Sequence, residues 1–587
     1  MNILVILAAS LIVLALGVRW YGKGISRWIR LNDDEPTPAV ARSDGRDFVP
    51  TKLHVIFAHH FSAIAGAGPI IGPTVAALYG FVPAWLWIIL GGIFFGAVHD
   101  FTSLFISVKE GGRSMAEITR KTLGGAGFVL FISFTIMMLL LVTSAFLNAT
   151  AMSLTSMWPL DKLGLPAHQT ILRTTDNPAT GAPDGIIGGI ASTSVIIITL
   201  LSPLLGWAII RRGGSTIVAY LIAAVVAIGS VWMGFMLPVS LPPQTWMVII
   251  AVYCLFAAGL PVWLILQPRD FINVQLLYGG MLMLVLGVLA GGVSGTTIGF
   301  PATSVQEGVK NLGLLWPMMF ITIACGAISG FHALVGGGTT SKQVARQSYA
   351  RKVGYGAMVL ESLLALLVLI AICGGLRYAD YLTLVHPEAG RGNPILAFSL
   401  SVGYLMEKAT GLPVYMGAIF GILMVEGFVI TSLDVAVRFI RYLLEELWAV
   451  VFTTVPRLLR NPWVNSGIAV AAMWALAAKN TFSALWPIFG SANQLLAALT
   501  LITVSVWLTL RGLRNWFTVI PALFMTATTV ASLILLLLTK YLPAHNYILV
   551  VASVMLLGLA VALAVIAVGK AVELSLLRHR PGQASSG

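Results

Sequence analysis

The chain has 587 residues, of which 58% are hydrophobic and only 10% are charged, with a formal net charge of +13. A soluble protein is roughly 25% charged and cannot bury so large an apolar fraction. The composition therefore excludes disordered, collagen-like, coiled-coil and disulfide-stapled secreted chains. It predicts an all-α polytopic protein whose partner is the lipid bilayer.

Apolar runs of about 20 residues, the length that crosses a bilayer, follow one another along the whole chain, and we expect about fifteen spans. They lie at 2–20, 55–80, 83–108, 125–157, 185–210, 215–237, 245–266, 276–298, 313–337, 354–374, 412–432, 463–478, 484–510, 516–538 and 546–568. Two further stretches, 394–407 and 434–451, mix charged with apolar residues, and we expect both to lie on or dip into the membrane surface. The alternative for either is a further span.

The basic residues indicate how the chain is oriented. Most of the 35 lysines and arginines fall in alternate loops, including 23–52, 109–121, 342–352 and 438–460 and the C-terminal tail. The positive-inside rule places these loops in the cytoplasm, with the N-terminus outside and the C-terminus inside. Because the charges are scattered among short loops and form no basic soluble face, we expect no nucleic-acid partner.

The second run contains an unusual concentration of glycine and proline. Between His59 and Pro73 there are three glycines and two prolines, which interrupt a helix and free backbone groups near the membrane centre. Such groups persist in a bilayer where they line a cavity, as in secondary transporters. The candidate substrate- and ion-binding residues are His59, His60, Gly66, Gly68, Pro69 and Gly72. The alternative is a proline kink whose small residues allow close helix packing.

A second interruption is expected at 256–270, where Gly259, Pro261, Gln267 and Arg269 are further binding candidates. On the predicted topology the two broken helices run in opposite directions, which is the pattern of an inverted repeat. We therefore predict a five-plus-five core. The segments are 1–54 (first span and basic loop), 55–238 (first repeat, broken at 59–73), 239–432 (second repeat, broken at 256–270) and 433–587 (surface helix and final spans).

Ionisable groups inside apolar runs are candidates for proton coupling, because a charge there is costly and faces a cavity. They are Asp100, His332, Glu361 and Glu426. The alternative for the carboxyls is a hydrogen bond to Ser or Thr of a neighbouring helix, and for Asp100 an ion pair at a cytoplasmic gate.

The two adjacent histidines, His59 and His60, point about 100° apart on a helix, so we expect one to face the site and the other to pack elsewhere. Nothing local completes a set of metal ligands, so no metal is expected.

Two polar stretches have less specific sequence patterns than the broken helices. The run from Gly336 to Lys342 lacks the spacing of a phosphate loop, but its hydroxyls, Thr339 and Thr340, are candidates for coordinating a cation. Asn493 and Gln494 stand at the start of a span, where capping or packing is the expected role.

These motifs together resemble the carbon starvation protein A family of bacterial inner-membrane proteins. The resemblance rests on the run from His59 to Pro73, on His99-Asp100-Phe101, on Gln267-Pro268-Arg269-Asp270 and on 489–497. It implies a secondary carrier of peptides or pyruvate, used when carbon is scarce and coupled to protons, with a core of the amino acid–polyamine–organocation (LeuT-like) type. It also implies that Gln267 and Arg269 are possible contacts for a substrate carboxylate.

We therefore expect a proton symporter in the bacterial inner membrane, with no enzymatic activity and no cofactor. A sodium-coupled carrier is one alternative. Another is a nutrient sensor that acts through a partner protein.

Overall fold

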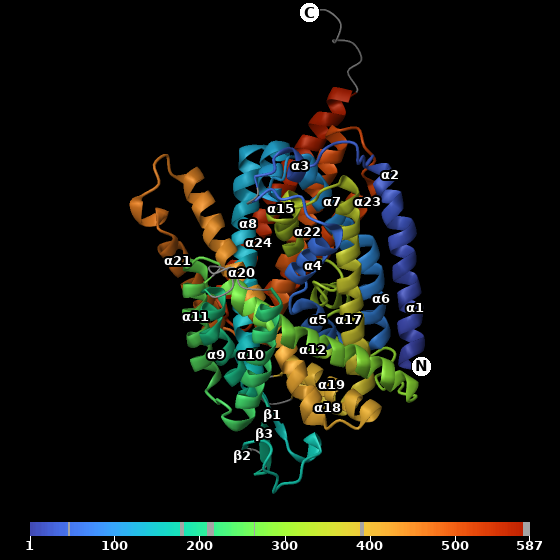
Figure 1. Cartoon of the computed structure of the whole chain (residues 1–587). Coiled ribbons are helices and arrows are strands. Elements are labelled where there is room, and N and C mark those ends of the chain that lie inside the picture. Colours follow the sequence, from blue (N-terminus) through green and yellow to red (C-terminus); the bar gives the residue numbers. More distant parts are fainter. Residues whose placement is uncertain (45–46, 177–180, 208–215, 263, 388–391, 579–587) are drawn as a thin grey trace, which may run out of the picture.

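The computed structural model describes all residues except 45–46, 177–180, 208–215, 263, 388–391 and 579–587. The described part is a bundle of helices with a small antiparallel sheet at one end, in the order β1-β3-β2 (Figure 1). Its strands are Met157–Pro159 (β1), Thr174–Asp176 (β2) and Pro183–Ile186 (β3).

The helices follow one another with short connections. They are α1 Ile3–Leu16, α2 Gly22–Trp28, α3 Pro38–Ala41, α4 Leu53–Ile64, α5 Gly68–Ala76, α6 Phe81–Gly91, α7 Ala97–Lys109, α8 Met115–Leu154, α9 Gly188–Gly206, α10 Thr216–Met236, α11 Pro243–Gly259, α12 Leu266–Val293, α13 Val305–Asn311, α14 Phe320–Thr322, α15 Phe331–Gly338, α16 Gln347–Ala350, α17 Gly356–Gly375, α18 Tyr378–Val385, α19 Pro394–Thr410, α20 Val414–Val451, α21 Pro462–Lys479, α22 Phe482–Leu510, α23 Trp516–Leu536 and α24 Tyr547–Arg578.

Short π-helical or 3₁₀ turns extend or join several of these helices. They lie at Gly17–Tyr21, Ala77–Tyr79, Gly92–Gly96, Asp161–Leu163, Leu315–Met319, Thr340–Lys342, Arg351–Tyr355, Arg457–Arg460 and Leu537–Tyr541.

Within the described residues, 11 helices are long and apolar enough to cross a membrane, or 12 if the bent pair Leu53–Ile64 and Gly68–Tyr79 counts as one span. The expected fifteen are therefore not reached. The run at 245–266 gives only α11, which is 17 residues long. The run at 313–337 is divided into short pieces, and in α21 the residues Pro462, Asn465 and Lys479 dilute the apolar character.

The two stretches that were expected at the membrane surface both pack against other helices of the bundle. The stretch 434–451 continues α20, whose Asp434 is fully buried. The stretch 394–407 belongs to α19, which is largely buried and packs against α17 and α20. The charge of Asp434 is tolerated in the interior because Arg269 of α12 lies 3.2 Å away, a partner that no local pattern reveals.

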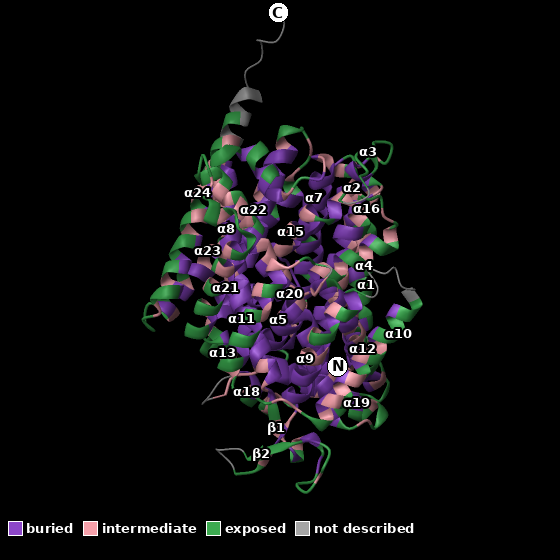
Figure 2. Ribbon diagram, turned by 60° about the vertical axis from the view of Figure 1, so that its left-hand side comes forward, coloured by how far each residue is buried: buried purple, intermediate pink, exposed green. Residues whose placement is uncertain are grey.

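The bundle has central and peripheral helices. The spans Gln347–Gly375 and Phe482–Leu510 are mostly buried (83% of their apolar segment), whereas Ile217–Met236 is mostly exposed (28% buried). Figure 2 shows the buried residues in the interior and exposed residues along the outer helices. Large apolar side chains such as Leu200 and Ile217 are among the exposed ones, as in a surface that faces lipid. The chain is a multi-pass membrane protein.

The two ends of the bundle differ in the elements that they carry. The strand end carries β1–β3, and the tail end carries the C-terminal part of α24 (Figure 1). α1 begins nearer the strand end and α24 finishes at the tail end.

Candidate functional site

The first predicted break is confirmed. α4 ends at Ile64, α5 begins at Gly68, and the two axes differ by 50°. Ala65 has a non-helical ψ of 85°, so the helical hydrogen-bond ladder stops there. Pro69 stands in the first turn of α5, where its missing N–H costs no helical bond.

A second break touches the first, at a position that the sequence did not indicate. Between α14 and α15, residues 323–330 leave the helix, within the run expected to be one continuous span. At 256–270, α11 ends at Gly259 and a separate long helix, α12, begins at Leu266. The chain thus leaves the helix where the sequence predicted an interruption. Gly326 and Gly330 inside an apolar run were the available sequence signal, of the kind that identified the first break.

The two broken helices run antiparallel along their whole length. Near the tail end the Thr51 amide donates to the Gln343 carbonyl at 3.0 Å, and near the strand end the Tyr79 hydroxyl donates to the Gly313 carbonyl at 2.7 Å. Between these points the breaks touch. A Cβ on Gly68 would collide with the Cys325 side chain, and one on Gly72 would lie 2.9 Å from the Thr322 carbonyl oxygen. Gly68 and Gly72 are therefore needed for close approach.

Side chains of α22 satisfy backbone groups that the second break leaves free. The Phe331 amide, which begins α15, donates to Asn493 Oδ1 at 3.1 Å. Gln494 Nε2 donates to the carbonyls of Phe320 at 2.8 Å and Ile323 at 3.2 Å. The sequence placed these amides at the start of a span, but they lie in the middle of α22, and the helix ends that they bond are those of α14 and α15. This bonding allows irregular backbone to persist at membrane depth.

A small cavity of about 20 Å³ lies where the two breaks meet. Its lining includes Gly66 from the first break, Cys325 from the second, Asn493 of α22 and Ser432 of α20. The volume holds one water molecule and is too small for an organic acid. The structure thus shows this space closed.

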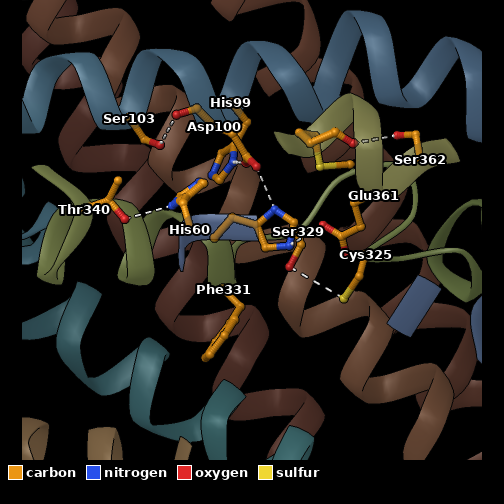
Figure 3. A network of polar contacts seen from close by, with 12 residues as sticks. His60, His99, Asp100, Ser103, Cys325, Ser329, Phe331, Thr340, Glu361 and Ser362 are labelled. Atoms are coloured by element: carbon orange, nitrogen blue, oxygen red, sulfur yellow. Dashed lines mark hydrogen bonds and ion pairs between the residues drawn. The ribbon is translucent and has the colours of Figure 1, made fainter. Parts of the chain in front are cut away.

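Beside the breaks, four helices bring ionisable side chains into one buried cluster (Figure 3). His332 of α15 lies between two carboxylates: its Nδ1 is 2.7 Å from Asp100 Oδ2 of α7, and its Nε2 is 3.2 Å from Glu361 Oε2 of α17. His99 Nδ1 is 2.7 Å from the other oxygen of Asp100. His60 Nδ1 of α4 is 2.8 Å from Thr340 Oγ1.

Three of the four proton-coupling candidates therefore meet in space: Asp100, His332 and Glu361, each at most 3% exposed. Asp100 is held by two imidazoles. Glu361 is different, because its contact with His332 lacks hydrogen-bond geometry and neither of its oxygens has a hydrogen-bond partner among the described residues. A buried carboxyl left in this way is unusual and requires an explanation.

The fourth candidate, Glu426, lies in α20 outside this cluster. Its Oε2 accepts a hydrogen bond from Ser153 Oγ of α8 at 2.9 Å, which is the helix-to-helix contact that the sequence left as the alternative. Thr339 Oγ1 donates to the Val335 carbonyl of its own helix, while Thr340 contacts His60.

Of the two adjacent histidines, His60 is buried in the cluster and His59 is exposed. The expectation that they point to different surroundings is confirmed. Within the described part of the chain, no group of three or more His, Cys, Asp and Glu side chains is arranged to hold a metal ion.

The residues predicted around 256–270 lie apart from this cluster. Pro261 and Gln267 are exposed, and Gly259 packs against the ring of Trp463. Arg269 is buried, with Asp434 Oδ2 at 3.2 Å, and the Tyr253 hydroxyl donates to the same Asp434 oxygen at 2.8 Å. The charge of Arg269 is thus already balanced inside the protein.

Comparison with known proteins identifies the family. The profile described as "Carbon starvation protein CstA" matches residues 2–392 and 383–532. The chain belongs to this family. The matched residues include the broken-helix pair and the buried cluster described above.

Two similar relatives carry functional names. The "Peptide transporter CstA" of Bacillus subtilis (strain 168) is 33% identical over 546 residues, which cover 86% of this chain and 84% of the relative. The "Pyruvate/proton symporter BtsT" of Escherichia coli (strain K12) is 32% identical over 607 residues, covering 89% and 80%. Both are named as transporters.

Among solved structures, MhsT in complex with L-phenylalanine matches 87% of this chain and 98% of its own, at 12% identity and a TM-score of 0.44.

Proposed function

We propose that this chain is a secondary carrier that imports small carboxylated nutrients, peptides or pyruvate, by proton symport. The observation that carries the proposal is the pair of interrupted antiparallel helices beside a buried cluster of Asp100, His332 and Glu361. Interrupted helices that meet near the membrane centre are how secondary transporters hold substrate and coupling ion. The relatives named a peptide transporter and a pyruvate/proton symporter give the substrate classes.

In this proposal the substrate occupies the space between the breaks, now the 20 Å³ cavity, after the two broken helices move apart. Gly66, Gly68 and Gly72 keep that surface free of side chains, so free backbone amides and carbonyls reach the substrate. His60 of α4 and the hydroxyl of Thr340, which follows α15, lie 2.8 Å apart on the two broken helices. In this proposal they form the polar part of the substrate-binding surface.

Glu361 is the group we assign to the coupling proton. It is fully buried and lacks a hydrogen-bond partner among the described side chains, so taking up a proton breaks no existing hydrogen bond. His332 adjoins it and is held in place by Asp100 on its other nitrogen. A change in the charge of Glu361 therefore alters the electrostatic force on His332. Because His332 belongs to α15, which begins at the second break, this force acts on the broken helix.

We also propose an inverted repeat, in which the partner of the first break differs from the one that the sequence predicted. We pair the first break with residues 323–330 and not with 256–270, because these two helices run in opposite directions and touch at their breaks. The strand end faces outside and the tail end the cytoplasm, as the distribution of basic loops indicates. The membrane is the bacterial inner membrane, and the setting is carbon starvation.

The test is uptake of labelled pyruvate, and in parallel of a labelled tripeptide, into proteoliposomes with an inward proton gradient. We expect Glu361→Gln to lower gradient-driven uptake at least tenfold while exchange of labelled for unlabelled substrate continues. Glu426→Gln is the matched control, since Glu426 is equally buried but already bonded to Ser153. Equal loss in both variants would remove Glu361 from coupling, and full uptake with sodium alone would replace the proton by sodium.

A further inference from the structure

A second, larger cavity opens at the strand end of the bundle, apart from the closed space between the breaks. Its volume is about 320 Å³. The walls come from the ends of α5, α8 and α18, the starts of α11, α19 and α22, and the turn after α23, together with His386 and Asn393.

The described lining of this cavity contains two basic side chains, Lys540 and His386, and no carboxylate. Lys540 lies in the π-helical turn Leu537–Tyr541 that follows α23, and its Nζ donates to the Ser483 carbonyl at 2.7 Å. Among the described residues no carboxylate lies within ion-pair distance of it. His386 Nε2 is buried and has no hydrogen-bond partner in the same part of the chain.

Neutral hydrogen-bonding groups surround these basic side chains. The uncharged residues Asn148, Asn393 and Thr481 also line the cavity. A lysine ammonium with spare donor capacity, set among amides and apolar walls, is suited to a small anion and unsuited to a cation.

The floor of the cavity reaches the second break. Thr322, the last residue of α14, and Trp486 of α22 both line it, and the Trp486 indole donates to the Thr322 carbonyl at 3.4 Å. The closed cavity between the breaks begins at Cys325, three residues further along the same segment. A molecule in the larger cavity is therefore separated from the space between the breaks only by the short segment from Thr322 to Cys325.

We propose that this cavity is an outer recognition site for the carboxylate of the substrate, with Lys540 as its charged contact. The inference rests on the proposed function, because it assumes that carboxylated nutrients are the cargo. It also replaces Arg269, whose charge Asp434 already balances, as the contact for the substrate anion. Lys540 holds the carboxylate at the entrance, and the carboxylate leaves it when the breaks open.

The experiment compares Lys540→Gln with Lys479→Gln, an exposed lysine at the end of α21 that does not line the cavity. In proteoliposomes with a proton gradient we expect Lys540→Gln to raise the KM for pyruvate or peptide at least tenfold, with a maximal rate within twofold of wild type. Lys479→Gln should leave both values unchanged, and Lys540→Arg should restore most of the KM. An unchanged KM in Lys540→Gln would overturn the inference.

Binding measured without transport separates this inference from the proposed function. Pyruvate should raise the Tm of the purified wild-type protein and of Lys479→Gln, but not that of Lys540→Gln. A tripeptide with a free C-terminal carboxylate should compete with labelled ligand at least tenfold better than its C-terminal amide. Carboxylate binding that depends on Lys540, in a protein that moves no substrate, would keep the site and reject the carrier. Transport that does not discriminate between the free acid and the amide would keep the carrier and reject the carboxylate site.

If Lys540→Gln does not fold, His386→Gln tests the same cavity from a different segment. We expect it to weaken binding of the free acid severalfold and to leave binding of the amide unchanged. Equal affinity of His386→Gln and wild type for the free acid would then count against the site.

Discussion

At the scale of single residues, Gly68 of the first break packs against Cys325 of the second. A Cβ on Gly68 would overlap both the sulfur and the Cβ of Cys325. We expect Gly68→Ala to destabilise the protein by about 1–3 kcal/mol, the usual effect of overpacking, and to abolish uptake. Thermal unfolding in detergent and proteoliposome uptake measure the two effects.

The double variant Gly68→Ala with Cys325→Gly should recover part of the lost stability, because it removes the side chain that the new methyl group meets. Gly467→Ala in α21 is the control, since nothing lies within 4 Å of a Cβ built there. A Gly68→Ala protein with wild-type Tm and uptake would show that the two breaks need not approach so closely.

At the scale of helices, α22 holds the second break in place through Asn493 and Gln494. Replacing either amide by leucine leaves buried backbone groups without partners, which costs about 1–3 kcal/mol for each group. We expect Asn493→Leu and Gln494→Leu to lower the Tm and slow uptake, whereas Gln244→Leu, at an exposed position in α11, changes neither. Unchanged stability in both amide variants would mean that the break does not depend on α22.

At the scale of the whole molecule, ion pairs join several helices at the tail end of the bundle. There Glu110 forms ion pairs with Lys121 and, at 2.7 Å, with Arg511, and it accepts a hydrogen bond from the Trp507 indole at 2.8 Å. These contacts join the end of α7 to α8 and α22. Glu35 pairs with Lys109 close by, and thus ties the loop after α2 to the same end of the bundle.

The tail-end contacts predict a dependence of stability on pH. Burial alone raises the pKa of Glu110, but the hydrogen bonds from Lys121 and Trp507 and the nearby charges outweigh it, so the pKa lies below its ordinary value. A carboxyl with a lowered folded pKa stabilises the fold above its unfolded pKa, about 4.3, and this contribution is lost as the pH falls through the folded value.

We therefore expect Glu110→Gln to be less stable than wild type at pH 7 by about 1–3 kcal/mol, and the difference to shrink at pH values below about 4. Thermal unfolding of both proteins across this pH range is the measurement. A constant difference down to low pH would mean that the charge of Glu110 contributes nothing to the tail-end contacts.

The sequence by itself determined the features that depend on local composition. Long apolar runs identify a multi-pass membrane protein, because a bilayer span needs only about 20 apolar residues in succession. The first break at 65–67 was predictable because glycine and proline disrupt a helix wherever they stand. The family was recognisable for the same reason, since its motifs are continuous in the chain.

Only the tertiary structure decided which distant residues meet. The sequence could not show that Asp434 balances Arg269, that Glu361 joins His332 and Asp100 while Glu426 bonds Ser153, or that the second break is at 323–330. These facts depend on how helices far apart in the sequence pack. A buried charge or a free carbonyl is tolerated only where another helix supplies its partner, and nothing local specifies that partner.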